Sequence, residues 1–412
     1  MARSEQIAAL DIGTTKVCCF VAEREAGDRV RVAGIGHHVS EGVRAGTIVD
    51  MQRAEQSVLA AVHAAEQMAG TTIREVIVNV SSGEPSSQFV DIDTDLSSQA
   101  VGDRELARLF NDEKLSVLAS ARHLIHAIPI GYKIDGSNGI RDPRGLHGHN
   151  LGVRLHAVTA APTVLRNVAN CVERCHLGLA NFAVNPYAAG LASVVEDELD
   201  LGVTVIDMGG GTTSIGIFFE GALVYVDSLP IGGNHITSDI ARGLSTPMQH
   251  AERMKTLHGT CLSSPTDETE NVAVPRVGED DEEQVTMIPK SFLISIIAPR
   301  VEETLELVRE RLVASGLDRK AGRRVVLTGG ASQLPGVREL AGQLLDKQTR
   351  MGRPIKVSGL AEATCGPAFS VCAGLLSLAV DDRGEAWPPP SLETPKMHGM
   401  FGKLGGWLRA NF

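Results

Sequence analysis

The sequence predicts an α/β protein built from two similar halves that close around a ligand bearing phosphates. Two loops rich in glycine and threonine support this prediction, because each begins with an aspartate at the end of an apolar strand: Asp11–Lys16 (DIGTTK) and Asp207–Thr213 (DMGGGTT). A third loop, Leu327–Ser332 (LTGGAS), follows another apolar strand. Glycine lets backbone N–H groups approach phosphate oxygens closely, and the aspartates bring a carboxylate to each loop. Repetition of the motif in the two halves indicates an internal duplication.

The residue types in the first two loops suit a phosphate chain with Mg²⁺. Backbone amides are expected from Gly13, Gly209, Gly210 and Gly211, hydroxyl groups from Thr14, Thr15, Thr212 and Thr213, and a cation from Lys16. Asp11 and Asp207 would hold Mg²⁺ through its water shell, because this ion gives up water reluctantly. The loops are not a P-loop, since neither GxxxxGK[ST] nor GxGxxG occurs. One such loop alone is often a plain hairpin turn, but three in this order are specific.

Composition places the chain among soluble globular proteins. Its 412 residues are enough for two or more domains, with 43% hydrophobic and 22% charged residues. The net charge of −11 argues against nucleic acid as a partner, since no long basic stripe offsets it. The seven cysteines have no CxxC spacing, so we expect buried thiols in a reducing cytosol. No export signal and no run of roughly 18 apolar residues is visible, which predicts a cytoplasmic protein without a transmembrane helix.

The first part of the chain alternates between strands and helices. Alternation of apolar residues predicts strands over Ile7–Ile12, Val17–Ala22, Arg29–Gly36 and Ile73–Val80. A helix is predicted from Met51 to Ala69, with Asp50 as its N-cap and Gly70 as its stop. From residue 83 to 160 the character changes to an inserted α+β subdomain. It contains strands Phe89–Leu96, Leu124–Ile134 and Leu151–Thr159, one helix over Asp103–Ser120, and a loop over 135–148.

The second half repeats the opening of the first. Strands are predicted over Val203–Asp207, Ser214–Glu220 and Ala222–Leu229, around the second loop. The acidic stretch Ser263–Gln284 is expected to be a surface loop, with a docking motif as the alternative. A long helix, Pro289–Ala314, leads to the strand Arg324–Thr328 and the third loop.

After Val380 the sequence becomes proline-rich, which predicts a linker. Apolar residues return at Phe401, Leu404, Trp407, Leu408 and Phe412. At 100° per residue they project within about 140° of one another on a helix, with Lys403 and Arg409 on the flanks. This pattern is typical of a helix that lies in an anionic membrane interface. The alternative is a terminal helix docked on its own core.

The ordered loops resemble those of the actin, sugar-kinase and heat-shock-chaperone ATPase superfamily, which implies a duplicated, actin-like (ribonuclease H-like) fold. By this resemblance the first two loops bind the phosphates of ATP, and Gly329, Gly330 and Ala331 border its adenosine. Glu252 and Lys255 fall where relatives contact ribose and adenine, although on sequence alone they read as a solvated helix face. Segments Asn185–Gly190 and Gly366–Gly374 are similar to the two helices that connect the halves.

The insert, the run Gly232–Lys255 and the C-terminal segment narrow the resemblance to the FtsA family of bacterial division proteins. The family's organisation implies the following units: 1–82 with 161–197 (subdomain 1A), 83–160 (1C), 198–231 with 297–380 (2A), 232–296 (2B), a linker over 381–399 and a membrane-targeting helix over 400–412. The resemblance covers nearly the whole chain.

The family resemblance also implies a function. It predicts an ATP-binding, filament-forming adaptor that tethers FtsZ to the cytoplasmic face of the inner membrane at the division septum and helps later divisome proteins assemble. The C-terminal peptide of FtsZ is expected on 232–296, where Lys290 and Arg300 could meet its carboxylates; ordinary exposed charges are the alternative. Asn185 is the candidate water-positioning residue. Relatives use Glu or Gln near this position, and an asparagine cannot act as a general base. The resemblance therefore implies weak or absent ATPase activity. The rival interpretations are a small-molecule kinase and a pilus-type actin-like scaffold, neither of which should end in a membrane anchor.

Overall fold

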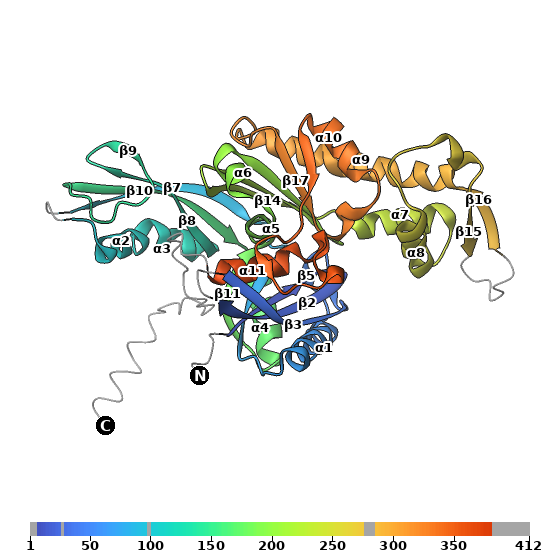
Figure 1. The fold of residues 1–412 in the computed structure, drawn as a ribbon, viewed down its shortest axis with the longest axis horizontal. Helices are drawn as coiled ribbons and strands as arrows, with labels where there is room; N and C mark the ends of the chain where they lie inside the picture. Colours follow the sequence, from blue (N-terminus) through green and yellow to red (C-terminus); the bar gives the residue numbers. More distant parts are fainter. Residues whose placement is uncertain (1–5, 26–28, 97–99, 276–284, 381–412) are drawn as a thin grey trace, which may run out of the picture.

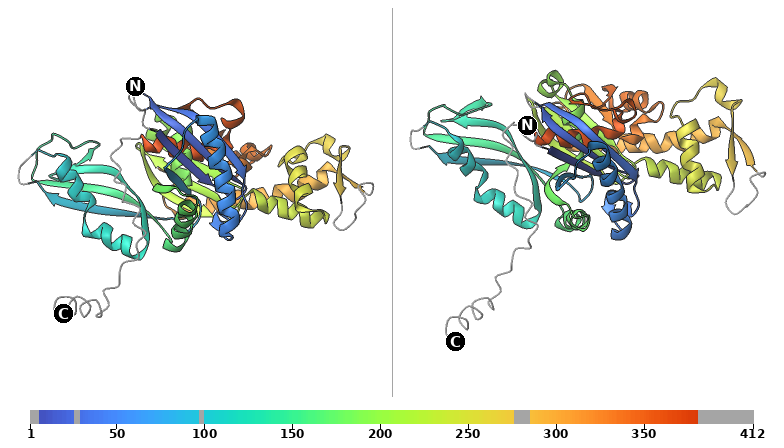
Figure 2. Two further views of the ribbon diagram at one scale, coloured as in Figure 1. Left: turned by 90° about the horizontal axis from the view of Figure 1, so that it is seen from below. Right: turned by 60° about the horizontal axis from the view of Figure 1, so that its bottom comes forward.

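The computed structural model describes residues 6–25, 29–96, 100–275 and 285–380. The molecule is elongated: two sheets with their helices form the centre, the inserted unit lies at one end and a helical unit with a small hairpin lies at the other (Figures 1 and 2). The predicted linker and terminal helix, with its five apolar residues, lie outside the described residues.

The first half is built on a six-stranded sheet with the order β11-β6-β1-β2-β3-β19. Its strands are β1 (Gln6–Ile12), β2 (Lys16–Glu25), β3 (Arg29–Val39), β6 (Glu75–Val80), β11 (Gly178–Val184) and β19 (Val357–Ser358), with a separate short hairpin of β4 (Val43–Arg44) and β5 (Thr47–Ile48). Its helices are α1 (Met51–Ala69), α4 (Pro162–Arg174), α5 (Asn185–Ser193) and α6 (Glu196–Leu201). Helix α1 has the predicted bounds, because the Asp50 side chain accepts from Arg53 N–H and Gly70 ends the helix at φ 65°.

The second half repeats this arrangement on a five-stranded sheet with the order β14-β13-β12-β17-β18. Its strands are β12 (Val203–Met208), β13 (Thr213–Phe219), β14 (Ala222–Leu229), β17 (Arg324–Thr328) and β18 (Gln348–Met351). Its helices are α7 (Gly233–Leu244), α8 (Met248–His258), α9 (Lys290–Ala314) and α10 (Val337–Leu345); the last helix, α11 (Ser370–Ala379), packs on α5 and on strands of the first sheet. Strand β12 pairs antiparallel with β13 and parallel with β17, as β1 pairs antiparallel with β2 and parallel with β6. The duplication expected from the repeated loops is therefore present in the sheets.

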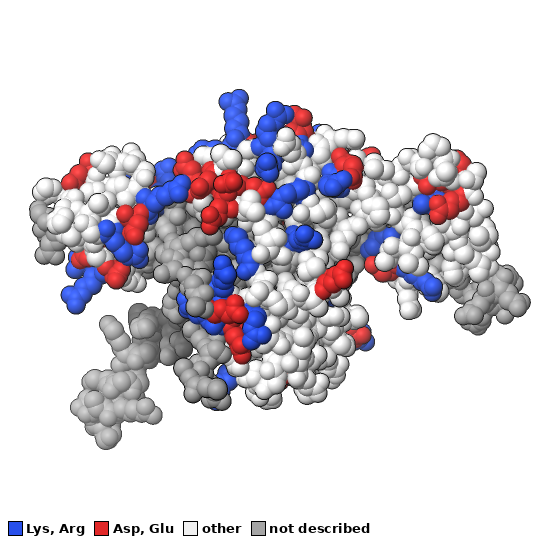
Figure 3. All heavy atoms as spheres, in the orientation of Figure 1, with Lys and Arg blue, Asp and Glu red and all other residues white. Residues whose placement is uncertain are grey.

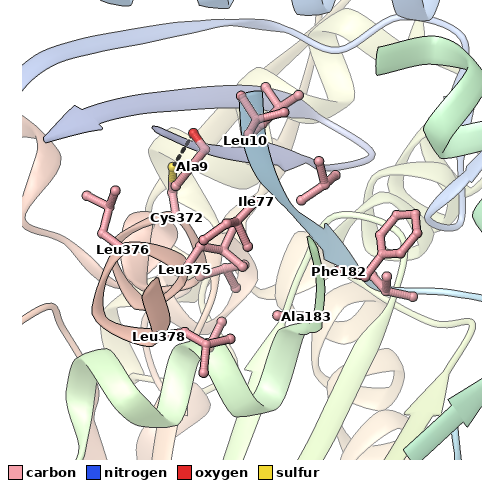
Figure 4. Close-up of a cluster of buried hydrophobic side chains, with 14 of the residues drawn as sticks. Ala9, Leu10, Ile77, Phe182, Ala183, Cys372, Leu375, Leu376 and Leu378 are labelled. Atoms are coloured by element: carbon pink, nitrogen blue, oxygen red, sulfur yellow. Dashed lines mark hydrogen bonds between the residues drawn. The ribbon is translucent and has the colours of Figure 1, made fainter. Parts of the chain in front are cut away.

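Helices α5 and α11 pack against each other between the two sheets. A Cβ added to Gly374 of α11 would lie 1.7 Å from the carbonyl oxygen of Ala188 in α5, so the helices cross at a distance that only glycine allows. Figure 4 shows Leu375, Leu376 and Leu378 of α11 in the buried cluster that also contains residues of β1. The Sγ atom of Cys372 lies 3.7 Å from the carbonyl oxygen of Ala9 in β1.

The inserted unit is a four-stranded sheet with the order β7-β10-β8-β9, covered by two helices. Its elements are β7 (Ser86–Asp95), α2 (Asp103–Phe110), α3 (Glu113–Ala121), β8 (His123–Ile134), β9 (Ser137–Ile140) and β10 (Asn150–Ala160). The prediction of one helix over Asp103–Ser120 is wrong, because the Asn111 side chain donates back to the Ala107 carbonyl at 2.9 Å and Asp112 caps a new helix. The predicted loop over 135–148 contains β9, since Asp135 and Gly136, both at positive φ, make a tight hairpin turn.

The predicted acidic loop is in part a strand. Residues Asn271–Pro275 form β15, which pairs with β16 (Val285–Pro289) at the far end of the molecule. Val272 and Val274 are buried on one face of this strand. The segment therefore has the alternation of apolar and polar residues that is typical of a strand, although its charge suggested a loop. Residues 276–284, which hold most of the acidic run, lie outside the described residues.

Basic and acidic side chains are interspersed on the face drawn in Figure 3. All seven cysteines are free thiols, and all but Cys365 are buried. Within the described part of the chain, no helix combines the length and the apolar character needed to cross a membrane.

Ser87 joins the insert to the second half. Its hydroxyl donates to the Val226 carbonyl of β14 at 3.2 Å, and the Val226 N–H donates to the same hydroxyl oxygen at 2.7 Å. The Nε2 atom of His156, on the neighbouring strand β10, lies 3.0 Å from this oxygen. Burial lowers the pKa of His156 to about 4, with a smaller contribution from nearby His126.

Stability should therefore fall on acidification through His156. Its pKa is lower in the folded chain than in the unfolded one, so its contribution is complete above the ordinary histidine pKa and is lost as the pH falls through 6.5 towards 4. Between pH 7 and pH 5 we expect the free energy of unfolding to drop by about 2 kcal/mol from this residue. His156→Gln should remove that part of the pH dependence in urea titrations. The same change at the exposed His147 of the insert is the control; equal slopes for both variants would contradict the assignment.

Candidate functional site

A cavity of about 450 Å³ lies between the two halves, where the β1–β2 and β12–β13 turns face each other. This volume is typical of small-molecule and cofactor sites. The predicted residues that line it are Asp11, Gly13, Thr14, Thr15, Lys16, Asn185, Asp207, Gly209, Gly210, Gly211, Thr212, Glu252, Lys255, Gly329, Gly330 and Ala331. The structure thus gathers residues from segments far apart in the chain into one site.

Thr213 is the exception among the predicted loop residues. It is fully buried at the start of β13, and its hydroxyl donates to the Ile231 carbonyl at 2.8 Å. The cavity lining includes Thr212 but not Thr213. Thr213 therefore joins the loop to the segment that precedes α7, and its hydroxyl is not directed to a phosphate.

Close contact between the two turns explains their glycines. A Cβ on Gly210 would lie 2.4 Å from Cγ2 of Thr15, and a Cβ on Gly211 would lie 2.5 Å from Oγ1 of Thr14. The first loop therefore packs directly on the second, and larger residues at these glycines would push the halves apart. Gly329, in the third loop, has φ +84° and would place a Cβ 2.5 Å from Oδ1 of Asp207.

The two strand-end aspartates are the most perturbed carboxyl groups of the cavity. Burial raises the pKa of Asp11 to about 7; the Lys16 ammonium opposes this shift and the Asp207 carboxylate adds to it. Burial also raises the pKa of Asp207, against a hydrogen bond from Asn185 and the charge of Lys16. Two buried carboxylates that share one cavity destabilise each other unless a cation neutralises them, so the donor set fits a divalent ion.

The number of carboxylates indicates how such an ion would be held. No group of three or more His, Cys, Asp or Glu side chains gathers in the ranges that the structure describes. Two carboxylates leave most positions around Mg²⁺ to water and phosphate oxygens, which is how this ion is usually bound. The residues present therefore fit the predicted Mg²⁺, held by Asp11 and Asp207.

Lys16, the first residue of β2, contacts the segment that directly precedes α11. Its ammonium donates to the Ala368 carbonyl at 2.7 Å and lies 3.4 Å from the centre of the Phe369 ring. Ala368 also lines the cavity. In the sequence, nothing marked Ala368 or Phe369 as a site residue except its position in the Gly366–Gly374 segment.

Glu252 and Lys255, both on α8, line the cavity and form a hydrogen-bonded network with α7. The Lys255 ammonium lies 2.7 Å from Glu252 Oε2 and donates to Thr237 Oγ1 at 2.8 Å and to the Gly233 carbonyl at 3.1 Å. The Thr237 hydroxyl donates to Glu252 at 2.5 Å. The pair is therefore tied to α7 and is more than a solvated helix face.

Asn185 lies at the start of α5, between the two halves. Its Nδ2 donates to Oδ2 of Asp207 at 3.0 Å, and its Oδ1 accepts from Nδ2 of Asn79 at 3.1 Å. Asn79 is buried and was not predicted, because a single asparagine inside an apolar strand has no pattern that distinguishes it.

Lys290 and Arg300 lie on α9 and do not line this cavity, and each already has an acidic partner. Lys290 pairs with Glu270 at 2.8 Å and Asp267 at 3.5 Å, and the hydrogen bond to Glu270 raises the pKa of Lys290. Arg300 pairs with Asp239 at 2.5 Å and with Glu303. Neither cation is an unpaired charge on the surface.

The comparisons with known proteins agree on one family. A family model described as "Cell division protein FtsA" matches residues 204–374, and one described as "SHS2 domain inserted in FTSA" matches residues 82–159. Over 422 residues the chain is 42% identical to the cell division protein FtsA of Rhizobium meliloti (strain 1021), covering 100% of this chain and 96% of that protein. For the cell division protein FtsA of Escherichia coli (strain K12) the identity is 31% over 415 residues, covering 98% of each.

Solved structures show the same fold at lower identity. The PilM–PilN type IV pilus biogenesis complex matches with a TM-score of 0.65 and 16% identity over 91% of this chain and 98% of that one. MreB5 of Spiroplasma citri bound to ADP matches with a TM-score of 0.52 and 15% identity over 90% and 94%. These likenesses establish the actin-like fold alone. Family models match the insert and most of the second half, and relatives named FtsA are 31–43% identical over nearly the full length. The chain therefore belongs to the FtsA family of cell division proteins.

Proposed function

We propose that the chain binds ATP with Mg²⁺ between its halves and acts as an actin-like, filament-forming division protein that tethers FtsZ to the cytoplasmic face of the inner membrane. The observation that carries the proposal is the pair of buried carboxylates, Asp11 and Asp207, which equivalent strands of the two halves bring into one cavity. When bound, Mg²⁺ would neutralise this pair and part of the phosphate charge. MreB5, which shares the fold, was crystallised with ADP.

The cavity residues take distinct roles in this proposal. Backbone amides and hydroxyls of the two turns (Gly13, Thr14 and Thr15; Gly209, Gly210, Gly211 and Thr212) would hold the phosphates. Lys16 would exchange the Ala368 carbonyl for a phosphate oxygen. Gly329, Gly330 and Ala331 would border the adenosine, beside the Glu252–Lys255 pair. We propose weak or no ATP hydrolysis, because Asn185 donates to Asp207 and cannot take a proton from water.

The elongated shape suits contacts between copies. The insert and the unit of residues 232–296 lie at opposite ends of the molecule (Figures 1 and 2), so a contact between them would join copies head to tail. We also propose that 232–296, with α9, takes the C-terminal peptide of FtsZ. Acidic groups of that peptide would have to compete with Glu270 for Lys290 and with Asp239 for Arg300.

The membrane part of the proposal depends on the sequence of the terminal segment 400–412. Burial of its five large apolar side chains would contribute roughly 7–15 kcal/mol, whereas ordering about ten residues costs on the order of 10–20 kcal/mol. One copy should therefore bind weakly to anionic lipid, and many copies linked in a filament would bind firmly. We therefore propose that the protein works at the membrane of the division septum, where later divisome proteins assemble.

Truncation after Pro395 should abolish co-sedimentation with anionic vesicles in the presence of ATP and Mg²⁺, while ATP binding stays unchanged. Trp407→Glu in the full chain should lower the pelleted fraction at least about tenfold, because it places a charge in the apolar stripe. Trp387→Glu, in the proline-rich segment, is the matched control. If truncated and full chains pellet alike, or neither pellets, the terminal segment is not the anchor and the kinase and pilus-scaffold alternatives return.

A further inference from the structure

Asn79 is a buried side chain next to the cavity that has no role in the proposal above. It lies in β6, is 3% exposed and does not line the cavity. Its Oδ1 accepts from the backbone N–H of Ile12 at 2.7 Å, directly after Asp11, and its Nδ2 donates to Oδ1 of Asn185 at 3.1 Å. Asn185 in turn donates to Asp207 at 3.0 Å. Three hydrogen bonds thus connect the backbone beside one carboxylate to the other carboxylate, across the two halves.

The direction of these hydrogen bonds is determined at both ends. A backbone N–H can only donate, so the oxygen of Asn79 faces Ile12 and its amino group faces Asn185. Asp207, when ionised, can only accept, so the amino group of Asn185 faces Asp207 and its oxygen faces Asn79. Rotating either amide by 180° would place donor against donor or acceptor against acceptor. The two ends therefore fix both amide orientations together.

This orientation has a chemical consequence for a water molecule in the cavity. Water that attacks a phosphate must be oriented by an acceptor, and Oδ1 is the only side-chain acceptor of Asn185. In the structure that oxygen is bonded to Asn79, and the group turned to Asp207 is a donor. Asn185 lines the cavity, so the same side chain would present its oxygen to the site if the amide turned over.

We propose that Asn79 is a positioning residue: it holds Asn185 as a hydrogen-bond donor to Asp207 and so withholds the Asn185 oxygen from the water that would attack bound ATP. This inference depends on the proposed binding of ATP. It deepens that proposal by giving slow hydrolysis two causes. One is that residue 185 is an asparagine, and the other is that Asn79 occupies the oxygen of this asparagine. Asn79 acts only through Asn185 and touches no ligand itself.

The test is a double-substitution cycle on the full chain, using Asn79→Ala, Asn185→Ala and the two combined. ATP affinity and the rate of phosphate release with Mg²⁺ are measured for each protein. Asn79→Ala should raise phosphate release per bound ATP by about threefold to tenfold, with little change in affinity, because the Asn185 oxygen loses its partner and can accept from water, while only the hydrogen bond to Asp207 still holds the amide. In the Asn185→Ala background the same change should have no effect on release. Asn181→Ala, which truncates another buried asparagine of the same sheet outside the cavity, is the matched control.

The outcomes separate the inference from a purely structural role. A rise in phosphate release that disappears without Asn185 supports the inference, and the coupling excludes simple loss of packing. Equal effects of Asn79→Ala in both backgrounds, or a release rate that is unchanged or lower, overturn it. Asn79→Asp is a second variant that keeps the side-chain volume; its carboxylate offers no donor to the Asn185 oxygen and competes with Asp207 for the Asn185 amino group, so it should again speed release. If the unsubstituted chain does not bind ATP, the proposed function fails and the inference fails with it, whereas ATP binding with additive substitutions overturns the inference alone.

Discussion

Asp207→Asn should weaken Mg²⁺-dependent ATP binding by at least about 100-fold, equivalent to roughly 3 kcal/mol. The substitution keeps the shape of the side chain and still offers an oxygen to the Asn185 amino group. It removes one of the two buried strand-end carboxylates that line the cavity, so the cation that accompanies the phosphates loses half of the charge compensation that this pair supplies. Titration with ATP in the presence of Mg²⁺ gives the affinity directly.

The same substitution should leave the ligand-free protein as stable as before, or more stable by about 1–2 kcal/mol, because it removes a buried charge. Burial raises the pKa of Asp207, so its ionised form is the strained one in the absence of a cation. Asp227→Asn is the control: this carboxylate lies on β14 of the same half and accepts from the Tyr225 hydroxyl at 2.9 Å, outside the cavity. Equal losses of ATP affinity in the two variants would show that the cavity is not the site.

Gly374→Ala should lower the free energy of unfolding by about 3 kcal/mol, although alanine ordinarily stabilises a helix by about 1 kcal/mol relative to glycine. The sign reverses because the new Cβ would lie 1.7 Å from the Ala188 carbonyl oxygen, a backbone atom of α5 that cannot move aside cheaply. Urea denaturation followed by circular dichroism measures the change in stability.

We also expect Gly374→Ala to reduce ATP affinity. Helix α5 starts with Asn185, and α11 follows directly on Ala368, which holds Lys16, so separating the helices displaces both. Gly131→Ala is the control for stability, since Gly131 has no positive φ and nothing lies within 4 Å of its added Cβ. A Gly374→Ala protein as stable as the Gly131→Ala protein would mean that the crossing of α5 and α11 tolerates a wider separation.

The sequence predicted those parts of the fold and site that have a local signal. Helix α1 could be bounded to the residue because its cap, Asp50, and its stop, Gly70, are both residue types with a strong positional preference. The two glycine- and threonine-rich loops of the cavity could be placed because glycine, threonine and aspartate in fixed order after an apolar strand are rare by chance. The break between α2 and α3 was missed because helical periodicity continues through Asn111, whose side-chain hydrogen bond is a matter of local geometry.

Other parts of the site depend on contacts between distant segments, which have no signature in one sequence. Asn79 reaches Asn185 across 106 positions, and Lys16 reaches Ala368 across 352. Thr213 was included among the ligand-binding residues because its hydroxyl follows that of Thr212. It is the first residue of β13 and donates to the Ile231 carbonyl, and only Thr212 of the two lines the cavity. Strand β15 was missed because the charges that follow it outweighed two valines in alternation.

The contacts of α11 and β19 determine how late in synthesis the first half can complete its core. Strand β19 pairs with β3, and α11 closes the core beneath β1, so the earliest strands are completed by segments made almost last. At ~5–20 residues per second, the 352 positions that separate Lys16 from Ala368 take roughly 18 to 70 s to synthesise. Throughout that time the apolar surface that receives α11 has no partner in the nascent chain. A ribosome that stalls before residue 357 therefore carries a first half that lacks both β19 and α11, with the apolar surface beneath β1 uncovered.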